Sequence, residues 1–413
     1  MVTIIRAHFS LLAATAILLL GSGLLSTLVA LRAEIESFPQ VIIGTIMSGF
    51  FMGYVVGSYL CPMVIRTFGH IRSFSVFAAL GCATVILHGL IIDPIVWLIL
   101  RFITGICMLG MYLVIESWLN SAATNKTRGS VFSVYMAINL LALGCSQYLL
   151  LIYKIDSLAS FALIALFFSL ALLPIALTFV EQPAKVEKGH LGLKQLYITS
   201  PLACFGALIS GIANGAFWGM GPVYALSAGF DVAGVSLFMS AVIFGGSLLQ
   251  WPLGHLSDNY DRRLVIVMVS IIGGLAAVAA FYMIESHQAI GLLAAFILGG
   301  CVFSIYPLSM AHASDSADNA HVLEISRGLL LLSGIGATIG PLTAGIFMGW
   351  FSPQVLMIYF AALMLLLAGL ALMRRTIGTP IKVSDQGDFV IMARSSPALL
   401  ELDPRADHAD TKD

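Results

Sequence analysis

Long apolar runs, separated by short polar breaks, fill most of the first 375 residues of this chain. A helix that crosses a membrane needs about 20 predominantly apolar residues. Hydrophobic residues make up 59% of the sequence and the mean hydropathy is +0.99, which is more apolar surface than a water-soluble core could hide. Runs of this length exclude the strands of a membrane barrel, so the sequence predicts an all-α membrane protein. The twelve expected transmembrane helices cover 8–31, 40–60, 73–92, 94–117, 130–153, 157–180, 200–227, 232–253, 264–284, 288–311, 327–350 and 353–374.

The positive charges are distributed unevenly when these helices are threaded from a cytoplasmic N-terminus. Seventeen lysines and arginines then fall on the cytoplasmic side, Arg32 and Lys154 fall opposite, and Arg101 lies inside a helix. Cytoplasmic loops carry an excess of Lys and Arg. The sequence therefore predicts a multi-pass protein with both chain ends in the cytoplasm.

The longest internal break between the expected helices, EQPAKVEKGHLGLKQLYITS (181–200), divides them into six and six. Features recur in the two halves: Gly57 matches Gly254 after the second helix of each half, and Arg128-Gly129 matches Arg327-Gly328 before the fifth. Such internal symmetry is typical of transporters whose substrate site lies between repeats near the membrane midplane. We therefore expect two pseudo-symmetric six-helix bundles, at 1–180 and 200–375, joined by a cytoplasmic linker at 181–199 and followed by a cytoplasmic, disordered tail at 376–413.

The segment GHLSDNYDRR (254–263) is expected to form a cytoplasmic loop between the eighth and ninth helices. It resembles the cytoplasmic G-x-x-x-D-x-x-x-R-R signature of the major facilitator superfamily, whose plan is also six plus six helices. Other segments resemble the YcaD-type bacterial permeases of that superfamily, and the likeness extends to about residue 375. It implies a transporter in a bacterial cytoplasmic (inner) membrane. The segments are GHIRSF, RFITGICMLGMYLVIESWLN, TRGSVFSVYM, QWPLGHLSD, YPLSMAHA and SRGLLLLSGIGATIGPL.

The resemblance implies a cytoplasmic gate that closes in one state of the transport cycle. In the superfamily the acid equivalent to Asp258 meets the start of a helix of the other half, here near Gly129, where free N–H groups stabilise a carboxylate. The first half has Cys61 where the acid would fall. The alternative is that these segments are charged for topology alone, which explains the arginines but not the acids. The expected gate residues are Gly254, Asp258, Arg262, Arg263, Arg72, Glu116 and Arg128.

One face of the fourth expected helix carries Arg101, Gly105, Tyr112 and Glu116, because these positions fall within a sector of about 80°. Ionisable groups inside a membrane are costly and usually functional. In the superfamily an R-x-x-x-G pattern on this helix lines the cavity and is associated with proton coupling; Arg101 and Gly105 match it. Two alternatives stay open: Arg101 could snorkel to the outer interface, and Glu116 could pair with an arginine of the gate.

Further polar side chains occur on the fifth, seventh and tenth expected helices, where Tyr306-Pro307 is expected to interrupt the tenth. The alternative for each is a hydrogen bond between helices that helps the bundle pack. The expected substrate-cavity residues are Arg101, Tyr112, Asn139, Gln147, Asn214, Trp218 and Tyr306.

The function expected from these features is secondary transport of a small organic solute by alternating access, with protons as a candidate coupling ion. A lone cavity cation favours anionic or neutral cargo. A multidrug exporter and a non-transporting membrane sensor are the alternatives. The sequence has no H-E-x-x-H and no G-x-S-x-G motif, so we expect no enzyme, no catalytic residue, no metal and no cofactor. The expected partners are the solute, protons and the lipid bilayer, without nucleic acid, and the protein is expected to be monomeric.

Overall fold

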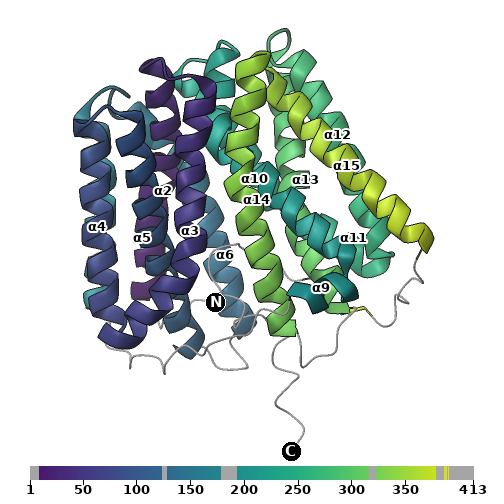
Figure 1. The fold of residues 1–413 in the computed structure, drawn as a ribbon, viewed down its shortest axis with the longest axis horizontal. Helices are drawn as coiled ribbons and strands as arrows, with labels where there is room; N and C mark the ends of the chain where they lie inside the picture. The colour runs from purple at the N-terminus through teal and green to yellow at the C-terminus, as the bar shows by residue number, and fades with distance from the viewer. Residues whose placement is uncertain are drawn as a thin grey trace, which may run out of the picture. The chain divides into compact units, whose positions relative to one another are not determined.

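The computed structural model describes residues 9–122, 128–177, 193–315, 322–377, 386, 387 and 389. Within these residues, twelve helices are long and apolar enough to cross a membrane, which confirms the twelve expected spans. No strand occurs in the described part of the chain. The all-α membrane fold is therefore confirmed (Figure 1).

The chain forms two compact units, and the first contains most of the first six spans. In this unit Asp93 caps the start of α5. Its Oδ1 accepts hydrogen bonds from the N–H groups of Ile95 and Val96, both at 2.9 Å. Ser157 caps α7 in the same way, by accepting from the N–H of Ala159. The helices are α2 (Phe9–Ile35), α3 (Gln40–Phe68), α4 (His70–Leu90), α5 (Pro94–Ala122), α6 (Arg128–Ser146), the 3-10 turn η1 (Gln147–Leu151), α7 (Leu158–Leu170) and α8 (Leu172–Ala176).

The second unit contains the remaining six spans and a short helix that precedes them. Asp231 caps α11 by accepting from the N–H of Gly234, and Asp261 caps α12 by accepting from the N–H of Arg263. Its helices are α9 (Leu193–Thr199), α10 (Pro201–Ser227), α11 (Val232–Asn259), α12 (Arg262–Met283), α13 (Gln288–Asp315), α14 (Val322–Trp350) and α15 (Val355–Ile377).

The two units pair their helices in the same pattern. In the first unit α2 packs on α6, α4 on α7, and α4 on α5. In the second unit the helices in the corresponding places do the same: α10 packs on α14, α12 on α15, and α12 on α13. This repeated pairing is the pseudo-symmetry that the sequence predicts for the fold class.

Glycines let certain helix backbones approach closely. A Cβ built on Gly105 of α5 would collide with the backbone carbonyl of Phe50 on α3. In the second unit, a Cβ on Gly299 of α13 would collide with the carbonyl of Val242 on α11. The second and fourth spans of each unit are therefore in backbone contact, as small residues allow inside membranes.

Helix α3 belongs to both units. Its residues up to Ser48 group with the second unit, and those from Gly49 group with the first. The backbone N–H of Leu342 on α14 donates to Ser48 Oγ at 3.1 Å, and a Cβ on Gly44 would collide with the carbonyl of Pro341. The first part of α3 is thus packed tightly against α14.

Two expectations about local structure were wrong. The charged segment 254–263, expected as a loop, consists of two helix ends, because α11 continues to Asn259 and α12 begins at Arg262. The expected break at Tyr306-Pro307 is absent, since α13 runs unbroken through Pro307. A proline inside a helix removes one backbone hydrogen bond, but packing in a bundle can hold the helix on both sides of it.

Candidate functional site

The polar face of α5 lies inside the first unit. Arg101 is 1% exposed, and the carbon at the centre of its guanidinium group lies 4.6 Å from the centre of the Phe50 ring on α3. This is a cation–π contact. Its Nε and Nη1 atoms are buried and have no hydrogen-bond partner among the described residues. No ion pair joins Arg101 to any of the described residues. The guanidinium is thus held in the bundle interior, where snorkelling to the outer interface does not account for its burial.

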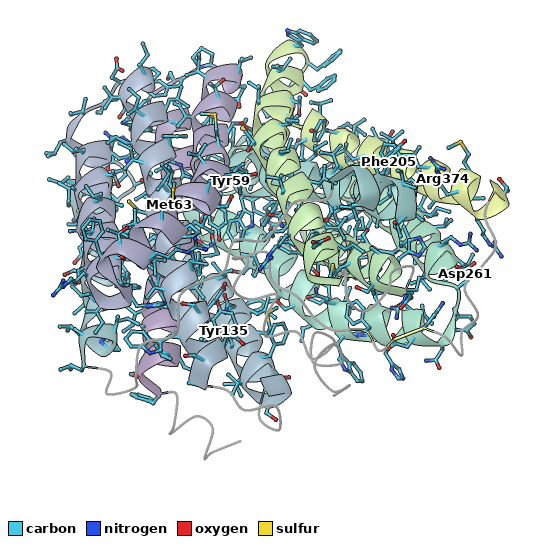
Figure 2. All side chains as sticks on the ribbon, turned by 60° about the horizontal axis from the view of Figure 1, so that its bottom comes forward. Tyr59, Met63, Tyr135, Phe205, Asp261 and Arg374 are labelled. Atoms are coloured by element: carbon cyan, nitrogen blue, oxygen red, sulfur yellow. The ribbon has the colours of Figure 1, made fainter. Side chains whose placement is uncertain are left out.

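Near the other end of α5, Glu116 is fully buried and accepts a hydrogen bond from the hydroxyl of Tyr135 on α6. Asn139 lies one turn further along α6, and its Nδ2 donates to the carbonyl of Tyr135 at 2.8 Å. The ring of Tyr112 lies 6.4 Å from the ring of Tyr54 on α3, measured between centroids. Half-buried Tyr54 of α3 and buried polar groups of α5 and α6 therefore form an aromatic and carboxylate cluster in the first unit (Figure 2 labels Tyr135).

The side-chain amide of Gln147 both accepts and donates hydrogen bonds within the bundle. Its Oε1 accepts from the hydroxyl of Thr27 on α2 at 2.7 Å, and its Nε2 donates to Ser146 Oγ at 3.1 Å. The Nε2 atom also lies 3.4 Å from the carbonyl oxygen of Gly23. These contacts tie η1 to α2, and they support the packing role that was the alternative for this residue.

The expected cavity residues of the second unit have different exposures. Asn214 and Trp218 are half-buried on α10, whereas Tyr306 of α13 is fully buried. Phe217, beside Trp218, packs edge-on against Phe303 of α13 with ring centroids 5.9 Å apart. Aromatic packing therefore joins α10 to α13 close to these polar positions.

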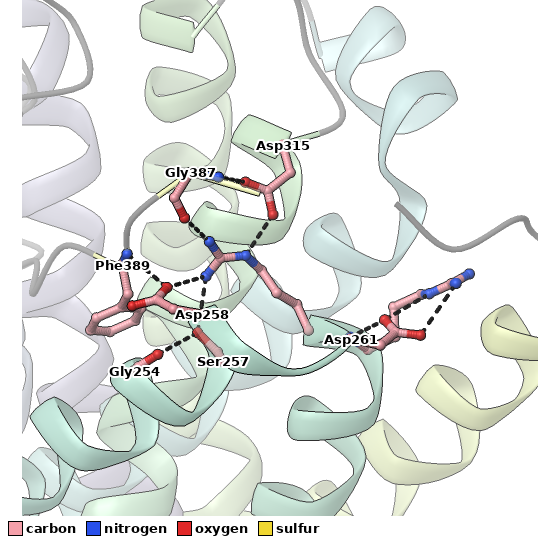
Figure 3. A network of polar contacts seen from close by, with 9 residues as sticks. Gly254, Ser257, Asp258, Asp261, Asp315, Gly387 and Phe389 are labelled. Atoms are coloured by element: carbon pink, nitrogen blue, oxygen red, sulfur yellow. Dashed lines mark hydrogen bonds and ion pairs between the residues drawn. The ribbon is translucent and has the colours of Figure 1, made fainter. Parts of the chain in front are cut away.

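Arg262 is the centre of a polar network at one end of the second unit (Figure 3). Its Nε donates to Asp315 Oδ2 at 2.5 Å, and its Nη1 donates to Ser257 Oγ at 2.9 Å. Nη1 also lies 3.5 Å from Asp258 Oδ1. We call these four residues, Ser257, Asp258, Arg262 and Asp315, the Arg262 network.

A segment that follows the last span lies on this network. The N–H of Phe389 donates to Asp258 Oδ1 at 2.9 Å, and the N–H of Gly387 donates to Asp315 Oδ1 at 3.0 Å. Arg262 Nη2 donates to the carbonyl of Gly387, and the ring of Phe389 covers Gly254. Figure 3 shows Gly387 beside Asp315 and Phe389 beside Asp258.

Sequence reasoning missed Asp315 and the two tail residues. The run ASDSAD (313–318) after the tenth expected helix was the available signal for Asp315, since acids are rare in this chain. The patch FVIMA (389–393), which begins at Phe389, was the available signal for the tail, because its residues are apolar. Neither signal identifies Arg262 as the common partner.

The remaining expected gate residues lie elsewhere in the structure. Arg263 pairs with Asp261, with its Nε 3.2 Å from Asp261 Oδ1. Arg72 is exposed near the start of α4, and the side chain of Arg128 lies outside the described residues. Among the described residues, no group of three or more His, Cys, Asp or Glu side chains is placed to hold a metal ion.

The sequence matches the family model described as "Major Facilitator Superfamily" over residues 11–326 and again over 203–399. An uncharacterized MFS-type transporter of Enterobacter sp. (strain 638) is 30% identical over 370 residues, which cover 88% of this chain and 94% of that protein. The uncharacterized MFS-type transporter YcaD of Escherichia coli O45:K1 (strain S88 / ExPEC) matches with the same identity and coverage.

Solved structures of transporters have a similar fold. The nucleoside transporter NupG superposes with a TM-score of 0.76 at 15% identity, covering 90% of this chain and 100% of that one. A bacterial homolog of the human lysosomal transporter Spinster, inward-facing and unoccupied, superposes with a TM-score of 0.71 at 14% identity, covering 93% and 98%. At these identities the likeness concerns the fold.

Proposed function

This chain belongs to the major facilitator superfamily, and we propose that it is a secondary active transporter that moves a small organic solute by alternating access. The observation that carries the proposal is Arg101, a guanidinium group buried in the first unit without a counter-charge among the described residues. An arginine at the centre of a membrane helix costs about 2.5–3.5 kcal/mol on insertion scales. Charged residues that are kept inside a membrane despite this cost usually have a functional role.

The chemistry of Arg101 favours a solute with an acidic group. A guanidinium carries five N–H donors in a planar fork that suits a carboxylate or phosphate. The Phe50 ring stabilises the cation from one side but accepts no strong hydrogen bond, and Nε and Nη1 remain without an acceptor among the described residues. An anionic solute would supply those acceptors. The Phe50 ring beside the guanidinium group would leave room for an apolar part of the solute.

Alternating access requires a contact that opens on the extracellular side, and we place it between α3 and α14. With the N-terminus in the cytoplasm, as the positive charges favour, α3 enters the membrane from outside, so Gln40–Ser48 lie at its outer end. The packing of this part on α14, while the rest of α3 packs in the first unit, makes α3 the helix that must separate from α14 when the outer side opens.

Thermal unfolding of the purified full-length protein tests the role of Arg101. A panel of small organic acids is compared with the matching amides. An acid that binds should stabilise the wild type by about 2.7 kcal/mol at 100 times its Kd. Arg101→Lys should keep part of this gain because it keeps the charge, and Arg101→Gln should lose it.

The acid that stabilises the protein is then followed into proteoliposomes, with empty liposomes as the control. Uptake that requires the protein and falls in Arg101→Gln supports the proposal. If Arg101→Gln is stabilised by the acid and takes it up as well as the wild type does, Arg101 does not bind the substrate.

A further inference from the structure

We infer that the tail segment containing Gly387 and Phe389 is a built-in ligand of the Arg262 network, and that its docking controls the gate to which Asp258 belongs. Regulation of the gate rests on the proposed function, alternating access, together with the gate expected from the superfamily resemblance, in which Asp258 makes a contact that closes the cytoplasmic side. The docking itself rests on contacts within the second unit alone.

The tail supplies partners that the buried charges of the network need. Arg262 is 1% exposed and Asp315 is 4% exposed at their side chains. A buried ion pair is tolerable only when its remaining donors and acceptors are also satisfied. Gly387 provides both kinds, because its carbonyl accepts from Arg262 Nη2 and its N–H donates to Asp315 Oδ1. Removing the segment would take one acceptor from Arg262 and one donor from Asp315.

Phe389 joins the tail to the two motif residues on α11. Its N–H donates to Asp258 Oδ1, and its ring lies where a side chain at Gly254 would be. A glycine at this position therefore creates the seat for the ring. Since Gly254 and Asp258 are four residues apart, they lie on one face of α11 and form one receptor for a backbone N–H and the aromatic ring after it.

Docking of the tail and closure of the gate both use the carboxylate of Asp258 as a hydrogen-bond acceptor. The gate expected from the superfamily resemblance needs Asp258 to accept N–H groups at the start of a helix. With the tail docked, Asp258 Oδ1 already accepts from Phe389 and faces Arg262. The docked segment therefore competes with closure of the cytoplasmic side, and releasing it should shift the protein toward the outward-open state.

Hydrogen exchange of the full-length protein in lipid nanodiscs measures docking directly. The amides of Gly387 and Phe389 should exchange at least roughly tenfold more slowly than in the free tail peptide, since exchange then requires opening of the docked segment. Gly254→Ala should abolish this protection, because the added Cβ collides with the Phe389 ring while alanine favours the helix.

A matched pair at Gly387 separates docking from general changes in the tail. A Cβ on Gly387 would lie 3.8 Å from Asp315 Oδ1, an ordinary contact, so Gly387→Ala should dock normally. Gly387→Pro removes the N–H that binds Asp315 and should release the segment. Rapid exchange of the Phe389 amide in the wild-type protein would overturn the inference.

Labelling of Ser48→Cys with a membrane-impermeant maleimide tests whether docking of the tail controls the gate. Ser48 is 8% exposed against α14, so its labelling reports opening of that contact, and Cys145→Ser removes the natural cysteine that is exposed. Labelling should rise at least about twofold in Gly254→Ala and Gly387→Pro relative to Gly387→Ala. Unchanged labelling with lost amide protection would also overturn the inference. If docking and labelling behave as expected but no solute is transported, the proposed function fails and the inferred docking stands.

Discussion

Arg101 and Glu116 lie on one face of α5 and have different surroundings. They are separated by about 22 Å along the helix at 1.5 Å per residue. Arg101 meets the Phe50 ring, whereas Glu116 meets the hydroxyl of Tyr135. The two charges therefore do not neutralise each other, and each has its own partner from a neighbouring helix.

Removing the donor of Glu116 should destabilise the protein. Tyr135→Phe deletes the hydroxyl that binds this buried carboxylate, and a hydrogen bond to a charged group contributes about 1.5–3 kcal/mol. Tyr224→Phe is the matched control, since Tyr224 is equally buried and its hydroxyl has no hydrogen-bond partner among the described residues. Chemical unfolding should show a loss for Tyr135→Phe alone. Equal effects of the two changes would mean that the Glu116 contact contributes nothing.

The helical period was enough to predict which residues of α5 share a face, because side chains at i, i+4 and i+11 necessarily align. It could not reveal their partners. Thr27 lies 120 residues before Gln147, and Asp315 lies 53 residues after Arg262, so these pairs depend on how the helices pack. The role of each expected cavity residue in transport stays a prediction.

At the scale of the helix, backbone contact between α3 and α5 depends on Gly105. Gly105→Ala should lower stability by about 1–3 kcal/mol, the usual range for overpacking, because the added Cβ meets the carbonyl of Phe50. Gly369→Ala on α15 is the control: no atom lies within 4 Å of the added Cβ, so the better helix former should be neutral or stabilising. Thermal melting in one detergent compares the two variants. Similar melting temperatures would contradict the close approach.

Helix ends were harder to predict than helices. The charged segment 254–263 looked like a loop because polar residues interrupt an apolar pattern, yet α11 keeps its helical hydrogen bonds through Asp258. Asp261 then caps α12 through the N–H of Arg263, so two residues suffice to turn the chain. After the second span the corresponding turn is made at Gly69, whose φ of 83° is readily adopted by glycine.

For the whole molecule, the composition and the spacing of apolar runs determined the fold class, since lipid permits few ways to satisfy the backbone. The repeated helix pairing in the two units agrees with the internal symmetry seen in the sequence. The place of α3 in both units was not predictable, because a twelve-span pattern does not say which part of a helix packs on which neighbour. The expected limits of the two bundles, linker and tail remain a prediction.

The most direct test of alternating access is a reversible disulfide between α3 and α14. A Cβ on Gly349 would lie 3.8 Å from the Cβ of Gln40, which is the mean separation in a disulfide. The double variant Gln40→Cys/Gly349→Cys, with Cys145→Ser, should therefore crosslink on oxidation, and each single variant serves as a control.

Uptake of the stabilising solute into proteoliposomes is then measured before oxidation, after oxidation and after reduction. The account predicts that the crosslinked protein loses transport and that reduction restores it, because in the proposed mechanism α3 separates from α14 in every cycle. Undiminished uptake by protein that is fully crosslinked would contradict it.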